Sequence, residues 1–412
     1  MHYSRRLWLT LLVICVLSFG VLLWLGGEIY QQAPPIPERV VTTDGTTVYT
    51  GEQILNGQQA WFDAGGQQLG SVWGHGSYVA PDWSADWLHR EAVLLRNIIA
   101  KKKFNVAFDV LPPEQQLVAS GLMKQEMRHN TYDAQRNVVV ITPQRAQAIH
   151  QLAAHYDGLF SDAPAFHKLR VEYAMKENTL SSAVARADLS AFFFWSAWAA
   201  TTERPNNTIT YTSNWPHEEL VGNTPSPSLG IWSVASVILL LAGIGALVWY
   251  QIRDEHESVE ASPSKDPLFN VKLTPSMRAT TKYFYVVIAL FLVQILLGSM
   301  TAHYAVEGQD FFGIPLSRIL PYTVLRSWHT QLSVLWIATA WLATGLYIAP
   351  LISGHEPRFQ RAGVNILFIA LLILVVGSLA FGWLGTMGYL DSRQNFYIAS
   401  QGLECNNMVR QT

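Results

Sequence analysis

The sequence predicts a membrane-embedded, all-α bundle of about five helices, joined to a mixed, mainly helical extracytoplasmic domain. Five apolar runs each reach the ~20 residues that a bilayer crossing requires. Half of the 412 residues are hydrophobic and only 14% are charged, against ~25% in a typical soluble domain. A polar stretch, 28–228, separates the first two runs. The net charge of −2 without a long basic run excludes nucleic acid as a partner and leaves the lipid bilayer as the main one.

The cysteine content limits the cofactors that this chain can hold. Only two cysteines occur, Cys15 in the first apolar run and Cys405 near the end, so we expect no structural disulfide. No Cys-x-x-Cys-His motif exists for a covalent haem c, and no cysteine cluster exists for zinc or iron–sulfur. Any haem must therefore be held by side-chain ligation and packing.

The first apolar run, within 1–27, is interpreted as an uncleaved transmembrane anchor. It is longer than the apolar core of a signal peptide and lacks a small-residue cleavage site. Arg5 and Arg6 precede it, which places the N-terminus in the cytoplasm by the positive-inside rule. Residues 28–228 are then expected outside the cytoplasm.

Local patterns predict the elements of the outer domain. Asp44–Gly45 between alternating residues indicates a hairpin over Val40–Thr50. Asp82 or Ser84 could cap a helix that follows a glycine-rich loop. Helices are expected over 51–70, 88–103, 113–127 and after Thr142, with a strand over 137–141.

The apolar stretch Leu180–Thr202 has nearly the composition of a membrane span. Arg186 and Asp188 lie inside it, and charges at such positions are costly in a bilayer. We therefore interpret it as a core or membrane-proximal helix.

The second half of the chain predicts four more spans. A transmembrane helix over 229–251 leads into a basic loop, 252–282, which the positive-inside rule assigns to the cytoplasm. Residues 283–385 form three helices of a bundle, and 386–412 make a tail too polar to span. The segment 353–361 is a second basic inner loop, and both loops agree on one topology.

Two groups of residues in this half are candidates for function. His329 lies in Leu320–Pro350, an otherwise uncharged apolar run after Arg326, so it is either a haem ligand or a histidine bonded to a neighbouring helix. His303, Glu307 and Phe311 recur at i, i+4 and i+8, which would place them on one side of a helix. From spacing alone, an amphipathic interfacial helix with a His/Glu polar face is the favoured explanation of this second group.

Three motifs resemble a known family. They are VWGHGSYVAPDWSADWLHRE (Val72–Glu91), HYAVEGQDFFG (His303–Gly313) and RSWHTQLSVLWIATAWLATGLYIAP (Arg326–Pro350). The chain resembles the quinol-dependent nitric oxide reductases of bacteria, relatives of the haem–copper oxidases. The resemblance implies an incomplete haem–copper-oxidase-like bundle with a cytochrome-c-like outer domain that lacks haem c. It also implies that the protein lies in the bacterial inner membrane. The sequence does not decide whether it forms a homodimer.

The resemblance implies roles for individual residues. His329 matches an axial ligand of the low-spin haem b, and Arg326 one turn earlier matches a propionate partner. His303, Glu307 and Phe311 match a quinol pocket, where His303 and Glu307 would accept protons from the quinol. The family's calcium and propionate region matches three further residues, Gly76, Tyr78 and Glu404.

The sequence also departs from the family. Reduction of nitric oxide to nitrous oxide there requires a second haem b and a non-haem iron, with at least five further histidines. After His329 the sequence contains only His355. Together with CNNMVRQT after Glu404, this predicts a truncated, inactive reductase without binuclear-site ligands. The alternatives are a membrane-anchored sensor or binding protein and a quinol-linked b-type cytochrome subunit.

Overall fold

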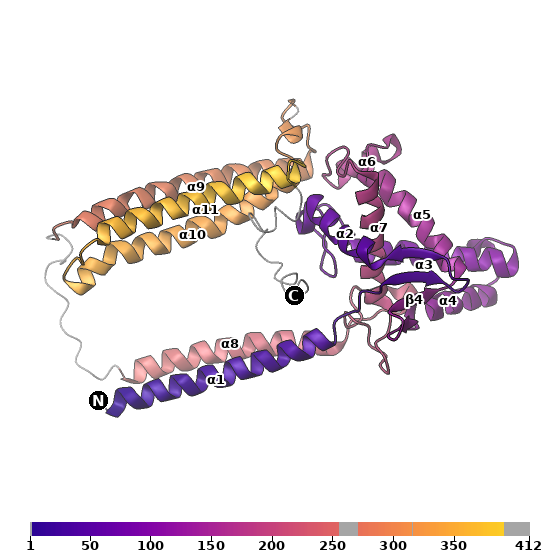
Figure 1. The fold of residues 1–412 in the computed structure, drawn as a ribbon, viewed down its shortest axis with the longest axis horizontal. Coiled ribbons are helices and arrows are strands. Elements are labelled where there is room, and N and C mark those ends of the chain that lie inside the picture. Colours follow the sequence, from indigo (N-terminus) through magenta and orange to yellow (C-terminus); the bar gives the residue numbers. More distant parts are fainter. Residues whose placement is uncertain (1, 255–270, 315, 391–412) are drawn as a thin grey trace. The chain divides into compact units, whose positions relative to one another are not determined.

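The computed structural model describes residues 2–254, 271–314 and 316–390, which form mainly helices (Figure 1). The elements in chain order are α1 (His2–Gln31), β1 (Arg39–Thr42), β2 (Thr47–Thr50), α2 (Gly51–Asp63), η1 (Gly66–Gln68), α3 (Trp83–Phe104), η2 (Phe108–Val110), α4 (Pro113–Arg128), β3 (Tyr132–Asp133), β4 (Val138–Ile141), α5 (Pro143–Phe160), η3 (Pro164–Phe166), α6 (His167–Glu172), α7 (Ala183–Thr201), η4 (Glu219–Val221), α8 (Pro227–Asp254), α9 (Pro275–Val306), η6 (Leu316–Arg318), α10 (Tyr322–Ser353) and α11 (Gln360–Thr386).

The described residues divide into two compact units. The first comes from residues 2–54, 87–150 and 194–225, and the second from 55–86, 151–193 and the described part of 226–390. We describe each unit by itself.

A small sheet organises the first unit. Its order is β2-β1-β4-β3, with β1 antiparallel to β2 and parallel to β4. The turn between β1 and β2 contains Gly45 at φ 89°, a conformation that glycine adopts without strain. The predicted hairpin and the predicted strand over 137–141 are both confirmed.

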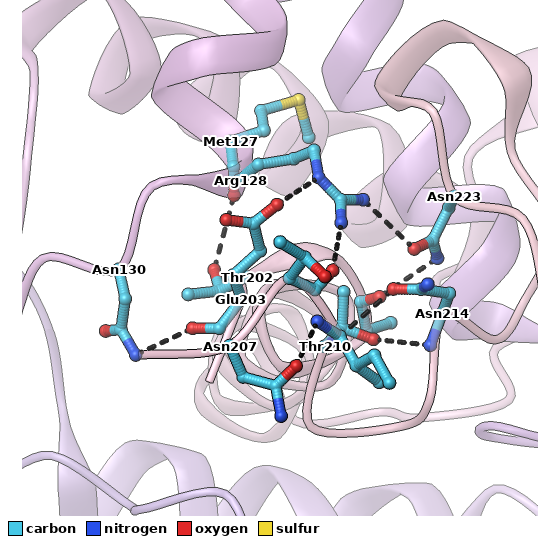
Figure 2. Close-up of polar contacts among 12 residues, drawn as sticks. Met127, Arg128, Asn130, Thr202, Glu203, Asn207, Thr210, Asn214 and Asn223 are labelled. Carbon is cyan, nitrogen blue, oxygen red and sulfur yellow. Dashed lines mark hydrogen bonds and ion pairs between the residues drawn. The ribbon is translucent and has the colours of Figure 1, made fainter. Parts of the chain in front are cut away.

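Polar side chains attach the segment after α7 to the end of α4 (Figure 2). The Arg128 guanidinium pairs with Glu203 at 2.9 Å and also donates to the Thr208 carbonyl at 3.1 Å. Asn130 donates to the Glu203 carbonyl at 2.9 Å. These bonds satisfy backbone groups of a segment that has little regular structure of its own.

Helix α7 supplies aromatic side chains to the interior. Phe193 is buried and its ring stacks on Trp83, with centroids 5.5 Å apart and planes 17° apart. Arg186 pairs with Asp157 at 2.6 Å, so the charge that argued against a membrane span is neutralised within the fold. The prediction of a buried core helix is confirmed, and α7 is not among the helices apolar enough to span a membrane.

Among the residues that the structure describes, five helices have the length and composition of membrane spans, and the chain is an integral membrane protein. They are Trp8–Gln31, Gly230–Arg253, Pro275–Val306, Tyr322–Ser353 and Gln360–Thr386. In the second unit α9, α10 and α11 pack side by side (Figure 1). The Tyr283 hydroxyl donates to the Val364 carbonyl at 2.7 Å, and Trp328 donates to the Leu379 carbonyl at 3.1 Å.

The start of α9 differs from the sequence expectation of Tyr283. The helix begins at Pro275, where the Thr274 hydroxyl caps the Met277 amide at 3.3 Å. The carboxylate of Glu356 accepts from the Ser276 amide at 3.1 Å. The first two turns are polar, so the apolar pattern that predicts a membrane span begins only near Tyr283. The cytoplasmic loop as we predicted it, 252–282, is therefore too long at its C-terminal end.

Candidate functional site

His329 lies between α10 and α9. Its Nδ1 is 2.9 Å from the backbone carbonyl oxygen of Gln294. Because a carbonyl oxygen can only accept, this hydrogen bond requires a proton on Nδ1, and in the neutral imidazole Nε2 then keeps its lone pair. Neutral imidazole with one nitrogen hydrogen-bonded and the other free to coordinate is the form that binds haem iron. The residue therefore fits an axial haem ligand, and the predicted bond to a neighbouring helix is present as well.

Arg326 lies one turn before His329 on α10. Its guanidinium carbon is 4.4 Å from the ring centroid of Tyr78, which belongs to the loop before α3. A cation over an aromatic face at this distance is attracted by the ring quadrupole. The Tyr78 side chain is 76% exposed, so the pair is open to an anionic group. The structure thus brings together two residues that we assigned separately to the haem propionates.

The loop that carries Gly76 is organised by Asp82. One carboxylate oxygen of Asp82 accepts from the Ser71 hydroxyl at 2.6 Å and the Gly74 amide at 2.7 Å. The other accepts from the Ala85 amide at 3.0 Å, so Asp82 rather than Ser84 caps α3. Gly76 has φ 82° and donates to the Ser71 hydroxyl at 2.7 Å. The carboxylate is occupied by these donors.

The described residues contain no cluster of carboxylates that would by itself mark a calcium site. Calcium takes six to eight oxygen ligands, including carboxylates. Nowhere in 2–254, 271–314 and 316–390 do three His, Cys, Asp or Glu side chains gather closely enough to hold a metal. Glu404, the third residue predicted for this region, lies outside the described residues. Calcium stays a prediction.

His303, Glu307 and Phe311 gather at the end of α9, but not through the helical spacing that we predicted. The helix ends at Val306, and Gly308 turns the chain with φ 95°. Phe311 folds back so that its ring stacks on His303, with centroids 4.2 Å apart and planes 5° apart. The expectation of three residues along one helix face is therefore wrong for Phe311, because a left-handed glycine ends the helix.

The same three side chains form a polar site with an aromatic wall. His303 Nδ1 is 3.1 Å from a carboxylate oxygen of Glu307. Their side chains are 40% and 42% exposed, so a ligand can reach both. An imidazole beside a carboxylate can accept a proton from a bound hydroxyl. The flat Phe311 ring offers a surface on which an aromatic ligand can stack.

Contacts from the preceding outer segment hold this region, and sequence reasoning missed them. Lys176 Nζ donates to the Thr386 carbonyl at the end of α11 at 2.9 Å. Gln309 Nε2 donates to the Met175 carbonyl at 3.1 Å. Burial lowers the pKa of Lys176. The partners are separated by more than a hundred residues and are backbone carbonyls, so no local signal identifies them.

Gln294 is a second residue that sequence reasoning missed. It is an amide side chain within the apolar run of α9, and such residues commonly mark functional positions in membrane helices. Its side-chain oxygen accepts from the Trp336 indole at 2.6 Å. The amide was visible in the sequence as a polar interruption, although its partners were not.

Comparison with known families agrees with this architecture. Residues 37–217 match the family model of the NorB cytochrome c-like domain, which belongs to nitric oxide reductase. Residues 278–404 match the model "Cytochrome C and Quinol oxidase polypeptide I". No curated protein matches the chain.

The two matches support one class of protein. They support an oxidoreductase of the haem–copper oxidase superfamily, in which haem is a plausible cofactor. Within that superfamily they support a member similar to the NorB nitric oxide reductases. The predicted fold class, a membrane bundle with a cytochrome-c-like outer domain, is confirmed.

Proposed function

We propose that this chain takes part in the reduction of nitric oxide to nitrous oxide with electrons from membrane quinol. The observation that carries the proposal is the succession of the two family matches along one chain. The cytochrome-c-like region, 37–217, has no Cys-x-x-Cys-His motif and so cannot carry a covalent haem c. Electrons therefore need another entry, and a quinol dissolved in the bilayer supplies one.

His303, Glu307 and Phe311 are the residues that we assign to the quinol. Oxidation of a quinol releases protons, and the His303–Glu307 pair offers an imidazole and a carboxylate 3.1 Å apart to receive them. Phe311 supplies a flat apolar surface for the ring. The site lies at the end of α9, a helix long and apolar enough to cross a membrane, and we expect a membrane-dissolved ligand to meet water there.

His329 and Arg326 are the residues that we assign to a low-spin haem b. When bound, haem b would carry electrons singly from the quinol toward the site of nitric oxide reduction. His329 would hold the iron through Nε2, and Arg326 would neutralise a propionate by a charge-assisted hydrogen bond. Tyr78 restrains the guanidinium for this task through the 4.4 Å cation–π contact.

Residues 1–412 hold too few histidines after His329 for the family's nitric oxide chemistry. Only His355 follows His329 in this sequence, and one histidine cannot supply a second haem and a three-histidine iron site. We therefore propose that residues 1–412 alone bind quinol and haem but do not turn over nitric oxide.

The test uses the full chain, produced with haem available and reconstituted in lipid nanodiscs. Haem is measured by a reduced-minus-oxidised spectrum, quinone binding by titration, and nitric oxide consumption by an electrode. We expect His329→Ala to abolish haem binding. His303→Ala should weaken quinone binding about tenfold, because loss of one hydrogen bond costs about 1.4 kcal/mol of binding free energy. His355→Ala, in an exposed loop, is the matched control for both.

Three results would overturn parts of the proposal. Wild-type protein that binds neither haem nor quinone would favour a membrane-anchored binding protein instead. Haem binding that survives His329→Ala would refute the ligand assignment. Nitric oxide turnover by this chain alone would refute the argument from the histidine count.

A further inference from the structure

Gly298 allows the His329 ring to approach α9 more closely than any other residue would. A Cβ placed on Gly298 would lie 2.7 Å from His329 Cε1 and 2.9 Å from Nδ1. Carbon atoms in favourable contact are about 3.5–4.0 Å apart. The three atoms nearest to this position all belong to the imidazole. The missing side chain of Gly298 therefore creates the space that the ring occupies.

The hydrogen bond from His329 depends on this close approach. Nδ1 donates to the Gln294 carbonyl, one helical turn before Gly298 on the same face of α9. A ring displaced from Gly298 would move away from that carbonyl at the same time. The glycine and the acceptor thus act on one imidazole from adjacent turns.

Gln294 is itself held in place from α10. Trp336, two turns after His329, donates its indole N–H to the Gln294 side-chain oxygen at 2.6 Å. Phe291 packs edge-to-face on Trp336, with centroids 5.3 Å apart and planes 74° apart. The α9 backbone at this level is therefore fixed on the side that faces His329.

We propose that Gly298 and the Gln294 carbonyl are positioning groups for His329, which select the Nδ1-protonated tautomer and the ring orientation in which Nε2 binds haem iron. This inference rests on the proposed haem function of His329. Hydrogen bonds to the outer nitrogen of a ligating histidine set its tautomer and raise its basicity, and their loss typically weakens binding 10–100-fold.

The first experiment titrates haem b into the full chain in nanodiscs. Gly298→Ala should weaken haem binding about 10–100-fold. It should also lower the iron–histidine stretching frequency of the ferrous protein after photolysis of its carbon monoxide adduct, because that frequency reports the Nδ1 hydrogen bond. Gly345→Ala in α10, where nothing lies within 4 Å, is the matched glycine control and should leave both readouts unchanged.

The second experiment needs no variant that perturbs packing. In ¹⁵N-histidine-labelled wild-type chain without haem, the His329 signals, assigned by their loss in His329→Gln, should show protonated Nδ1 and unprotonated Nε2. The opposite tautomer would overturn the inference even if Gly298→Ala does not fold.

The outcomes separate this inference from the function on which it rests. If the wild-type chain binds haem through His329 and the iron–histidine stretching frequency is unchanged in Gly298→Ala, only the positioning role is refuted. If the wild-type chain does not bind haem through His329 but shows the Nδ1-protonated tautomer, the proposed function is refuted while the geometry stands.

Discussion

A buried ion pair in the outer region gives the strongest test of the energetics. Arg145 Nε lies 2.6 Å from Glu91 Oε1, and the two side chains are 2% and 0% exposed. The other carboxylate oxygen of Glu91 accepts from the Trp87 indole at 2.9 Å. Arg145 also donates to the Glu126 carbonyl at 3.3 Å, and its guanidinium lies over the Phe194 ring. Both charges are thus desolvated and depend on each other.

Removal of one charge should cost far more than removal of both. Arg145→Met leaves a buried carboxylate without its cation, which typically costs about 3–5 kcal/mol. For a domain of this size we expect the unfolding temperature to fall by roughly 6–20 °C. In the double variant Glu91→Gln, Arg145→Met no buried charge remains, and the glutamine oxygen can still accept from Trp87. Its loss should be smaller than that of Arg145→Met alone.

The assay is a double-mutant cycle on the full chain in detergent, with unfolding followed by tryptophan fluorescence. The surface pair Arg136–Asp133, with Arg136 76% exposed, provides a control cycle that should give about 0–1 kcal/mol. If Arg145→Met lowers the free energy of unfolding by less than about 1 kcal/mol, these charges are not buried and interdependent. The same follows if the effects of Arg145→Met and Glu91→Gln add up in the double variant.

Three further predictions concern single positions. Gly57→Ala should lower the free energy of unfolding by about 1–3 kcal/mol, because its Cβ would lie 1.9 Å from a carbonyl oxygen of α7. Gly121→Ala has open space around its Cβ and should raise the free energy of unfolding by about 0.5–1 kcal/mol in the same thermal assay. Burial lowers the pKa of Lys176 below 10.5 in the folded chain. The unfolded chain therefore binds more protons, and the stability of the folded chain should rise as the pH approaches 10.5. Pulse proteolysis should show this rise in the wild type and not in Lys176→Met. Hydrogen bonds from the first turn of α9, the N-cap hydroxyl first, lower the pKa of Glu356 below 4.5. Protection of the Ser276 amide from hydrogen exchange should therefore be lost as pH falls through that lowered pKa, and Glu356→Gln should make the protection independent of pH.

The sequence predicted the elements whose signals are local. The Asp44–Gly45 turn specified the hairpin, and the charges of Arg186 and Asp188 correctly separated α7 from the membrane spans. Each decision rested on residues within one element, where periodicity and turn chemistry act directly. Long-range contacts such as Arg326 with Tyr78 carry no such signal, because neither residue constrains the backbone near the other.

The end of α9 shows that a local spacing pattern can also mislead. The spacing of His303, Glu307 and Phe311 predicted one helix face, but Gly308 within the same motif is a helix-ending signal. The three side chains still meet, because the turn at Gly308 returns Phe311 onto His303. The grouping was correct, but its stated geometric cause was wrong for Phe311.

The two interpretations of His329 that the sequence left open are compatible in the structure. A histidine that ligates iron needs a hydrogen bond at its other nitrogen, and the bond to Gln294 on the neighbouring helix supplies it. The sequence could not predict this bond, because its acceptor is a backbone carbonyl and its access depends on the absent side chain of Gly298. A half-buried histidine bonded to a neighbouring helix is therefore no evidence against ligation, and the question becomes which nitrogen carries the proton.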